Sequence, residues 1–318
     1  MKIAIDAMGG DYAPVEVIAG AVEWAQKTSN QVVLVGRQDT ILEELKNYQY
    51  DASLVSMVNA SQVIDMDESP ALALRKKKDA SILVATGLVK QGLADAVVSC
   101  GSTGAQMAAA LFLLGRMEGV ERPPIGVSIP NQSGGTTLLM DVGANVDCRA
   151  VQLVQFAALG SSYASSVQGI SNPRIALLNN GEEEGKGNSV SVEAYEMLSK
   201  QSSLNFIGNI EGRDLFSARS DVIICDGFTG NIVLKSIEGM AMFVAQLLAQ
   251  ECGKVPNALA KLDYTQVGGA PLLGIKGISV VCHGSSRRNS VYSGITIASE
   301  CIRNNMMQMQ QDTIKSLV

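Results

Sequence analysis

Five segments of the sequence place glycine and hydroxyl or amide side chains directly after a short apolar run and before a helix-length stretch. Glycine lets the main chain approach a ligand closely, and a helix N-terminus attracts anions. One such loop is common in α/β proteins, but five together favour a phosphate-like ligand. The segments are "VVSCGSTGA" (97–105), "LLMDVGAN" (138–145), "LLNNGEEEGKGNS" (177–189), "IICDGFTGN" (223–231) and "VVCHGSSRRNS" (280–290).

Two nucleotide-binding fingerprints fail on spacing. A dinucleotide site needs G-x-G-x-x-G after the first strand, whereas "DAMGGD" (6–11) has adjacent glycines. The segment "GEEEGKG" (181–187) is one residue too short between its glycines for a P-loop, and Gly187 stands where Ser or Thr must hold magnesium. We therefore expect no nicotinamide cofactor and no nucleotidase loop.

The elements that must position these loops follow a βαβ rhythm. Short β-branched runs alternate with helix-length segments, and several runs are continuously apolar, as strands covered on both faces are. This predicts a three-layer α/β/α fold with a mostly parallel sheet, in one large domain over 1–318 with possible seams at 59–70 and 253–271. The predicted strands are 2–6, 32–36, 53–58, 95–100, 136–142, 174–179, 221–226 and 278–283.

Composition narrows the class of protein. The net charge of −6 and an aromatic content of 4% argue against a nucleic-acid partner. The six cysteines show no metal-ligand spacing, and the N-terminus lacks a signal-peptide pattern, so we expect a reduced, cytoplasmic protein without a metal or other cofactor. No apolar run approaches the roughly 18 residues of a membrane span, the best being 105–115, and we expect no segment to cross a membrane.

Nine motifs, in order and spanning nearly the whole chain, resemble the signatures of the phosphate acyltransferase family PlsX. Jointly they are highly specific. They are "AIDAMGGDYAP" (4–14), "SCGSTGAQMA" (99–108), "RPPIG" (122–126), "MDVGANVDC" (140–148), "LLNNGEEEGKGN" (177–188), "FIGNIEGRD" (206–214), "CDGFTGNIVLK" (225–235), "GGAPLLG" (268–274) and "HGSS" (283–286).

The resemblance implies an enzyme of bacterial phospholipid synthesis. Such an enzyme converts long-chain acyl-(acyl-carrier protein) and inorganic phosphate into acyl phosphate and free acyl-carrier protein. The resemblance also implies the fold of phosphate acetyltransferases and isocitrate/isopropylmalate dehydrogenases, and a cytoplasmic homodimer with a helical, dimerising segment around 232–271. It further implies association with the membrane surface, where a membrane glycerol-3-phosphate acyltransferase consumes the product.

Two features depart from the family pattern. Family members commonly continue "HGSS" with an aspartate, whereas Arg287 and Arg288 follow here. The segment 252–267 is shorter than the amphipathic hairpin that helps family members touch lipid, which leaves membrane contact open.

The chemistry suggests three catalytic residues. Phosphate is itself a nucleophile, so positioning and charge stabilisation can supply much of the acceleration without a covalent intermediate. Lys186 would pair with phosphate or the oxyanion, or else balance the adjacent glutamates as a solvated lysine. Asn231 would donate to the carbonyl oxygen, or cap a helix. His283 would protonate the leaving thiolate or bind phosphate, or be structural.

The glycine loops supply the candidate phosphate- and substrate-binding residues. Asp226 and Asp6 could orient Lys186 or the loops, or cap main-chain N–H groups, and capping is the favoured role for Asp6. Cys100, Cys225 and Cys282 are expected to be small buried residues and not nucleophiles. The candidate binding residues are Gly101, Ser102, Thr103, Gly104, Asp226, Gly227, Gly230, Gly284 and Ser285.

An acidic carrier protein would be repelled by a chain of net charge −6 unless positive charge is concentrated locally. The densest basic cluster is Arg75, Lys76, Lys77 and Lys78. We take it as a candidate docking patch; a solvated helix face is the alternative, and Arg287 and Arg288 compete for the docking role. The apolar stretches 105–115 and 237–248 could line an acyl channel, or serve as core or dimer helices.

Two rival functions remain open. An oxidative decarboxylase of the same fold would need magnesium-binding aspartates and a nicotinamide site. A non-catalytic module would bind acyl-carrier protein or lipid but show no phosphate-dependent turnover.

Overall fold

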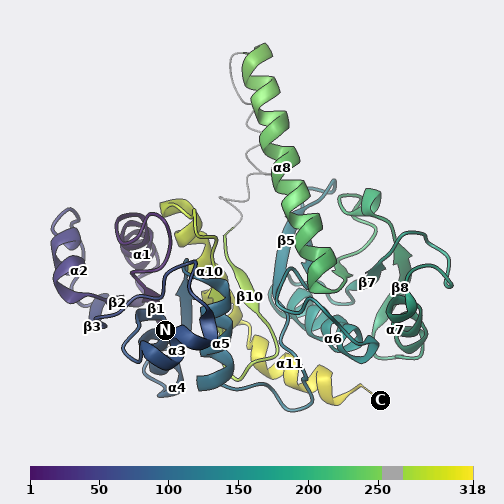
Figure 1. Ribbon diagram of the computed structural model, residues 1–318, viewed down its shortest axis with the longest axis horizontal. Helices are drawn as coiled ribbons and strands as arrows, with labels where there is room; N and C mark the ends of the chain where they lie inside the picture. Colours follow the sequence, from purple (N-terminus) through teal and green to yellow (C-terminus); the bar gives the residue numbers. More distant parts are fainter. Residues whose placement is uncertain (253–267, 318) are drawn as a thin grey trace. The chain divides into compact units, whose positions relative to one another are not determined.

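The computed structural model describes residues 1–252 and 268–317. The chain divides into two compact units, each with its own sheet (Figure 1). The first unit comprises Met1–Gly115 and Gly268–Arg303, and the second comprises Arg116–Val267 and Asn304–Val318. This division differs from the predicted single large domain over 1–318, because each unit has its own sheet and buries its own set of strands. The predicted seam at 59–70 is wrong, because it lies inside the first unit.

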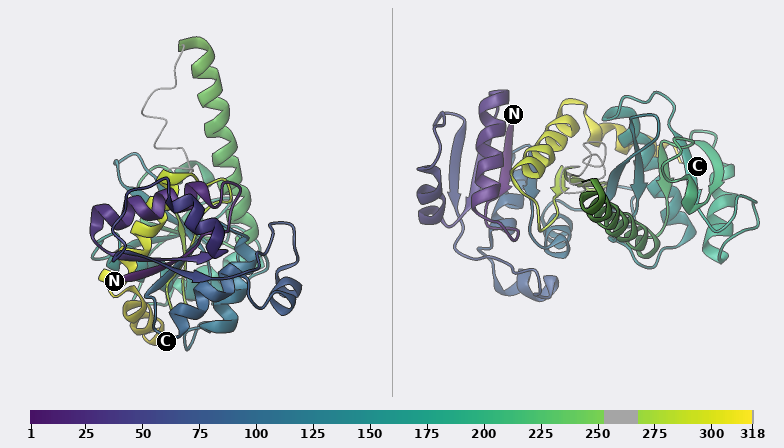
Figure 2. Two further views of the ribbon diagram at one scale, coloured as in Figure 1. Left: turned by 90° about the vertical axis from the view of Figure 1, so that its left-hand side faces the viewer. Right: turned by 90° about the horizontal axis from the view of Figure 1, so that it is seen from above.

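The first unit contains a six-stranded sheet in the order β10-β11-β4-β1-β2-β3, parallel except for the pair β10–β11. Helices α1 and α10 pack together on one face of this sheet, and α4 and α5 lie on the other (Figure 2). Its elements are β1 (Lys2–Asp6), α1 (Val15–Thr28), β2 (Gln31–Gly36), α2 (Gln38–Leu45), β3 (Val55–Asn59), α3 (Pro70–Lys76), α4 (Ser81–Lys90), β4 (Ala96–Ser99), α5 (Thr103–Leu113), β10 (Ala270–Leu272), β11 (Ser279–Val281) and α10 (Arg288–Arg303).

The second unit contains a five-stranded sheet in the order β5-β6-β9-β7-β8, in which only the pair β5–β6 is antiparallel. Helix α6 packs on β6, β7 and β9, and α7 and α11 pack on α6. The elements are β5 (Gly126–Pro130), β6 (Thr136–Met140), α6 (Ala150–Ser166), β7 (Arg174–Leu178), α7 (Ser189–Ser199), β8 (Asn205–Ile210), the 3-10 helix η1 (Gly212–Asp214), β9 (Val222–Ile224), α8 (Gly227–Cys252) and α11 (Met306–Lys315).

Tight helix packing holds each core together. In the first unit, a Cβ on Gly20 of α1 would lie 2.7 Å from the carbonyl oxygen of Arg288 and 2.7 Å from Cβ of Val291. Glycine at this position therefore lets α1 approach α10. In the second unit, Gly160 lets α6 approach β9, because a Cβ at this position would lie 2.7 Å from Cγ1 of Val222. Replacing either Gly20 or Gly160 by alanine would therefore push the packed elements apart.

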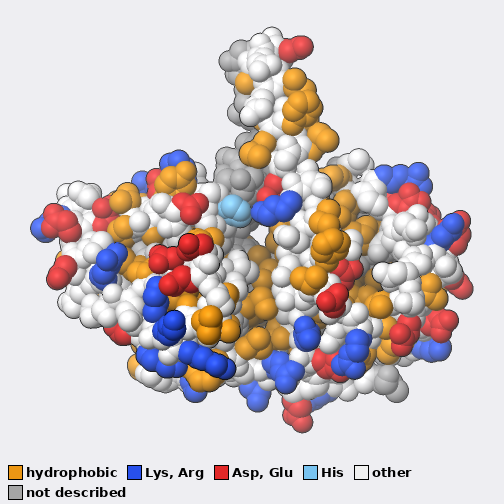
Figure 3. All heavy atoms as spheres, viewed as in Figure 1, with side chains coloured by type: hydrophobic (Ala, Val, Ile, Leu, Met, Phe, Trp, Pro, Cys, Tyr) orange, Lys and Arg blue, Asp and Glu red, His pale blue; other side chains and the backbone are white. Residues whose placement is uncertain are grey.

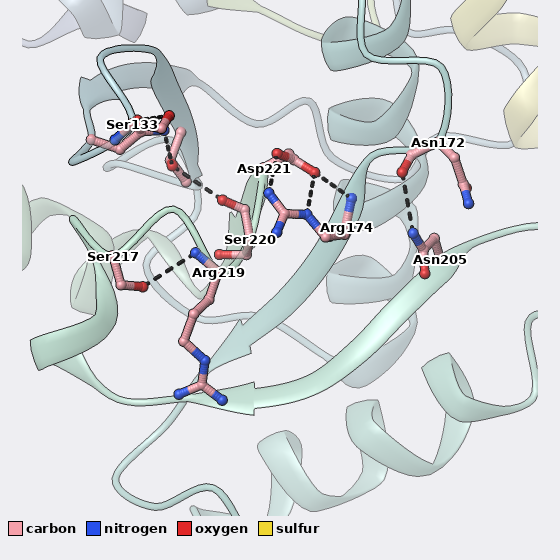
Figure 4. Close-up of polar contacts among 10 residues, drawn as sticks. Ser133, Asn172, Arg174, Asn205, Ser217, Arg219, Ser220 and Asp221 are labelled. Atoms are coloured by element: carbon pink, nitrogen blue, oxygen red, sulfur yellow. Dashed lines mark hydrogen bonds and ion pairs between the residues drawn. The ribbon is translucent and has the colours of Figure 1, made fainter.

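An ion pair joins the amino ends of β7 and β9 (Figure 4). The Arg174 guanidinium donates to both carboxylate oxygens of Asp221, at 2.9 Å from Nε and 2.8 Å from Nη2, and the Arg174 main-chain N–H donates to the same carboxylate at 2.8 Å. This bidentate geometry fixes the two strands at the edge opposite the glycine loops.

Helix α8 is 26 residues long and exposes most of its length. Figure 3 shows hydrophobic side chains along it, and Met240, Met242 and Phe243 are each more than half exposed. By length and composition alone, Gly227–Glu251 is sufficient to cross a membrane. The expectation that no apolar run approaches this length is therefore wrong for α8, which also contains a Lys235–Glu238 ion pair at 2.8 Å.

Candidate active site

A pocket of about 940 Å³ lies in the second unit, beyond the carboxyl ends of β6, β7 and β9. These three strands are adjacent and parallel, so their following loops meet at one edge, where α/β proteins bind ligands. Three of the five predicted loops (138–145, 177–189 and 223–231) end at this edge. The lining residues are Val146, Asp147, Cys148, Leu153, Leu177, Leu178, Asn179, Asn180, Gly187, Asn188, Val190, Ser191, Gly212, Cys225, Asp226, Phe228, Thr229 and Val233.

Two helices begin at the wall of this pocket. Asn188 caps α7, since its Oδ1 accepts from the Ser191 main-chain N–H at 2.9 Å. Asp226 caps α8, since its carboxylate accepts from the main-chain N–H and the hydroxyl of Thr229, both at 2.8 Å. The positive ends of both helix dipoles therefore face the pocket and favour an anion, while the Asp226 carboxylate opposes one.

Lys186 lies in the loop before α7, next to the lining residue Gly187, and is exposed. Its ammonium group has no hydrogen bond or ion pair within the described part of the chain, and the neighbouring glutamates do not occupy it. Glu182 pairs with Arg219 at 2.9 Å, and Glu184 accepts from the Tyr195 hydroxyl at 3.3 Å. The ammonium is therefore available to an anion at the pocket mouth.

Main-chain contacts hold the Lys186 loop in place. The Asn179 side-chain amide (Nδ2) donates to the Lys186 main-chain carbonyl at 2.9 Å, and the Lys186 main-chain N–H donates to the Glu183 carbonyl at 3.1 Å. Gly187 has a φ of +103°, and a Cβ there would lie 2.5 Å from Oδ1 of Asn179. Glycine is thus required next to Lys186 for both conformation and space.

Asn231 lies one turn inside α8 and is exposed. The hypothesis that it caps the helix is wrong, because Asp226 does so. Its side chain borders Gly143, in the loop after β6: a Cβ built on Gly143 would lie 3.7 Å from Oδ1 of Asn231. Asn231 therefore stands beside two of the three loops without being part of the pocket lining.

Gly227 and Gly230 have a packing role that the sequence does not reveal. A Cβ on Gly230 would lie 1.9 Å from the carbonyl oxygen of Asp141, and one on Gly227 would lie 2.7 Å from that of Asn145. The glycines bring the first turn of α8 against the loop after β6. Their predicted contact with substrate stays a prediction.

Asp141 is a buried residue that the sequence analysis did not single out. Its carboxylate accepts from the main-chain N–H groups of Ile125, Ala144 and Asn145 at 3.0, 3.1 and 2.6 Å, and from the Asn145 amide at 2.9 Å. Burial raises the pKa of Asp141, against the opposing effect of these hydrogen bonds. The residue holds the loop 141–145 in shape. Asp141 directly follows an apolar strand, and this position could have identified it from the sequence as a candidate residue.

A second group of loops meets in the first unit, beyond β1, β4 and β11. The Asp11 main-chain N–H donates to the Gly284 carbonyl at 2.8 Å, and a Cβ on Gly9 would lie 2.7 Å from the Gly101 nitrogen. Asp6 accepts from the Ser99 hydroxyl at 2.7 Å, and burial raises the pKa of Asp6. The Ser99 hydroxyl also accepts from the Gly101 main-chain N–H at 3.0 Å. Asp6 is thus linked through Ser99 to the loop that follows β4.

The glycine loop 101–104 forms the start of α5. Ser102 caps this helix, with its hydroxyl 3.4 Å from the Ala105 nitrogen, and Thr103 is exposed. A Cβ on Gly104 would lie 2.7 Å from Cγ of Pro70, so Gly104 admits the first turn of α3. Gly101, Ser102 and Gly104 therefore each have a local structural contact, and contact of the loop with substrate remains predicted.

His283 is exposed at the end of β11, and Ser285 contacts its ring. The Ser285 hydroxyl lies 2.7 Å from Nδ1, and the Ser285 main-chain N–H donates to Nδ1 at 3.2 Å. An N–H donor at Nδ1 places the proton of the neutral ring on Nε2. The following Gly284 is buried against Met66, whose Cε would lie 3.0 Å from a Cβ.

The cysteines are as buried as the sequence predicts. Cys100, Cys225 and Cys282 are each at most 3% exposed, and burial raises the pKa of Cys225 well above its ordinary value. Cys148, which lines the pocket, is half-buried, and burial raises its pKa to about 11. Neither Cys148 nor Cys225 is a ready thiolate at neutral pH. Among the described residues, no group of three or more His, Cys, Asp and Glu could hold a metal ion.

The basic residues divide into paired and unpaired ones. Lys77 donates to Glu68 at 2.7 Å and to the Val63 carbonyl at 2.6 Å, so it braces the chain before α3. Arg287 stacks on Tyr12, with its guanidinium carbon 4.1 Å from the ring centroid, and Arg288 pairs with Glu23 on α1. Within the described residues, Arg75, Lys76 and Lys78 have no such partner. They remain the candidates for docking.

The predicted site residues thus fall into two groups, each assembled within its own unit. Lys186, Asn231, Asp226, Gly227 and Gly230 belong to the second unit. Those of the first unit are Gly101, Ser102, Thr103, Gly104, Gly284, Ser285, His283 and the basic cluster 75–78. The sequence analysis did not select the pocket residues Asn179, Asn188 and Cys148, although Asn188, three residues before Ser191, has the spacing of a helix cap.

The fold defines the class of protein. The chain is similar to a phosphotransacetylase from Streptococcus pyogenes (TM-score 0.66, 19% identity, covering 95% of this chain and 94% of that one). It is also similar to a branched-chain phosphotransacylase from Enterococcus faecalis (TM-score 0.63, 16% identity, covering 96% and 99%). These likenesses show the predicted three-layer α/β/α fold with mostly parallel sheets.

Sequence comparison gives the family. The model described as "Fatty acid synthesis protein" matches residues 1–309. A phosphate acyltransferase from Syntrophomonas wolfei is 61% identical over 98% of each chain, and one from Heliobacterium modesticaldum is 50% identical over 100% of this chain and 99% of that one. The chain belongs to this family, and the resemblance to PlsX is confirmed. It is therefore an acyltransferase of fatty acid and phospholipid synthesis.

Proposed function

We propose that the enzyme converts long-chain acyl-(acyl-carrier protein) and inorganic phosphate into acyl phosphate and free acyl-carrier protein. A phosphate oxygen attacks the thioester carbonyl and forms a tetrahedral intermediate. The C–S bond then breaks, and the carrier thiolate leaves and takes up a proton. No electron donor or covalent enzyme intermediate is needed. The product feeds bacterial phospholipid synthesis.

The observation that carries this proposal is the pocket of about 940 Å³ in the second unit. The first turns of α7 and α8 line it, and the unpaired Lys186 stands beside it. An anion is favoured there by two helix dipoles and by one cation. The pocket also has apolar walls, including Leu153, Leu177 and Phe228, that suit the carbon chain of an acyl donor.

Each predicted catalytic residue has a role in this chemistry. Lys186 pairs with phosphate and with the oxyanion as negative charge moves onto the carbonyl oxygen. Asn231 donates its amide hydrogen to that oxygen. His283 belongs to the other unit, and its proposed role is to donate a hydrogen bond to phosphate through the Nε2–H of the neutral ring, while the departing thiolate takes its proton from water. Asp226 caps α8 and so shapes the pocket without taking part in proton transfer.

The test is phosphate-dependent turnover of palmitoyl-(acyl-carrier protein), with the product trapped as its hydroxamate. Loss of a charge that acts mainly in the transition state costs roughly two to three orders of magnitude in kcat. We expect Lys186→Ala to lose that much and Asn231→Ala to lose about tenfold or more. Lys200→Ala, at an exposed lysine in the same unit, is the matched control and should keep wild-type turnover. Near-normal turnover in folded Lys186→Ala would remove this residue from the mechanism.

The wider setting is also proposed. Acyl-carrier protein docks on the unpaired cations of the basic cluster, and the enzyme is a cytoplasmic homodimer that touches the membrane surface near a membrane glycerol-3-phosphate acyltransferase. The exposed apolar side chains of α8 support a dimer or lipid contact by the predicted segment 232–271 (Figure 3). Of the shortened segment 252–267, residues 253–267 lie outside the described residues.

A further inference from the structure

A second cavity lies wholly within the first unit, between helices α3, α4 and α5 and the strand β3. Its volume of about 650 Å³ falls within the range of ligand pockets, roughly 300–1,000 Å³. The walls rest on buried residues of the core, because Val58, Leu83, Val84 and Ala108 pack directly against it. The lining residues are Val58, Ala71, Leu74, Arg75, Lys78, Leu83, Val84, Gly87, Leu88, Gln91, Ala108, Phe112 and Leu113.

The cavity combines an apolar interior with positive charge. Two lining residues, Arg75 and Lys78, are exposed cations that form no hydrogen bond or ion pair within residues 1–252 and 268–317. Figure 3 shows Lys and Arg side chains gathered over α3 and α4. Phe112 is 75% exposed although it lines the cavity, which is an unfavourable position for a phenylalanine without a covering partner. A ligand with one long apolar part and one anionic group would satisfy both features.

We propose that this cavity binds a long-chain acyl phosphate, with the hydrocarbon between α3, α4 and α5 and the phosphate between Arg75 and Lys78. The identity of the lipid rests on the proposed function, because acyl phosphate is the product of that reaction. An acyl thioester has no anion next to its carbon chain, so a carrier protein docked outside could reach these cations but its acyl group inside the cavity could not pair with them. The acyl phosphate has a chain and an adjacent anion in one small molecule. The site therefore retains the product, separately from the pocket of the second unit.

Gly87 provides a specific way to close the cavity. It lines the wall from the middle of α4, and a Cβ built there meets no atom within 4 Å. Gly87→Leu should therefore occupy space meant for the ligand without disturbing the helix, and Gly87→Ala should leave most of that space open. Lys76 is the matched control for charge, since it is an exposed, unpaired cation on α3 that does not line the cavity.

The test is calorimetric binding of dodecyl phosphate, a stable probe with the same two features. We expect saturable binding to the wild type that strengthens roughly tenfold for each two methylenes between octyl and dodecyl phosphate. Gly87→Leu should weaken the binding of dodecyl phosphate at least tenfold. The double variant Arg75→Ala, Lys78→Ala should weaken the binding of dodecyl phosphate but not that of dodecanol. Gly87→Ala and Lys76→Ala should bind as the wild type does.

The outcomes separate this proposal from the proposed function. If the wild type forms acyl phosphate but its probe affinity is unchanged in Gly87→Leu, the cavity is not the lipid site and the catalytic proposal stands. If the wild type forms no acyl phosphate but Gly87→Leu still abolishes probe binding, the cavity binds lipid anions and the catalytic proposal fails. A Gly87→Leu variant that changes oligomeric state and keeps probe affinity would show that another protein surface covers the cavity, which also overturns the proposal.

Discussion

At the scale of single residues, several glycines that look like ligand contacts in the sequence have a contact with the protein itself. Gly230 admits the carbonyl of Asp141, and Gly187 admits the side chain of Asn179. From sequence alone, a glycine needed for close approach of main chain to ligand cannot be distinguished from one needed for close approach of main chain to main chain. Capping was only partly predictable: Asp226, for which a capping role was one of two alternatives, caps α8, whereas Asn231 does not.

Gly230→Ala should destabilise the second unit by more than about 3 kcal/mol, because the new Cβ would lie 1.9 Å from a main-chain oxygen that cannot move cheaply. Urea denaturation followed by circular dichroism measures the effect. Gly239→Ala is the control on the same helix: it meets no atom within 4 Å and should gain about 0.5–1 kcal/mol from helix propensity. Equal stability of the two variants would show that α8 does not approach Asp141 as described.

At the scale of elements, all eight strands predicted from apolar runs are present. The strands that the sequence did not reveal are β5, β8 and β10, which all lie at sheet edges. An edge strand need not be continuously apolar, and these contain Pro130, Gly208 and Pro271, which argue against a central strand. Burial on both faces thus made the central strands predictable, and the edge strand β3 was predicted from its own apolar run, whereas β5, β8 and β10 depend on their neighbours for pairing.

The ion pair between β7 and β9 gives a pH-dependent prediction for these elements. Burial would raise the pKa of Asp221, but the hydrogen bonds and charge of Arg174 outweigh it and lower that pKa below 3.8. A lowered pKa in the folded state stabilises the protein above the unfolded pKa, and this contribution is lost as the pH falls through the folded value.

Asp221→Asn should therefore cost about 1–2 kcal/mol at pH 7, and the difference from the wild type should shrink below pH 4. The lower part of that range is favoured because the Arg174 side chain is 43% exposed and solvent screens the pair. Urea denaturation at several pH values measures the difference. Asp67→Asn, at an exposed carboxylate in the first unit, should change neither stability nor its pH dependence. A penalty that stayed constant down to pH 3 would contradict the role of the Asp221 charge.

At the scale of the whole molecule, the five glycine loops identified in the sequence divide between two units. The loops at 97–105 and 280–290 meet in the first, and those at 138–145, 177–189 and 223–231 meet in the second. The order of the motifs along the chain could not predict this division, because residues 268–303 belong to the first unit although they follow every strand of the second unit in the sequence. The motifs were sufficient to predict the family. Which of the motifs lie close together depends on how the strands pair, and the sequence did not show this.

If phosphate is the nucleophile that attacks the acyl thioester, its oxygens must pass into the product. Phosphate labelled with oxygen-18 at all its oxygens is supplied together with palmitoyl-(acyl-carrier protein), and the mass of the product is measured by mass spectrometry. We expect acyl phosphate that keeps every labelled oxygen, because the attack breaks the C–S bond and leaves the P–O bonds intact. Unlabelled fatty acid as the only acyl product, or no product from folded enzyme, would contradict it.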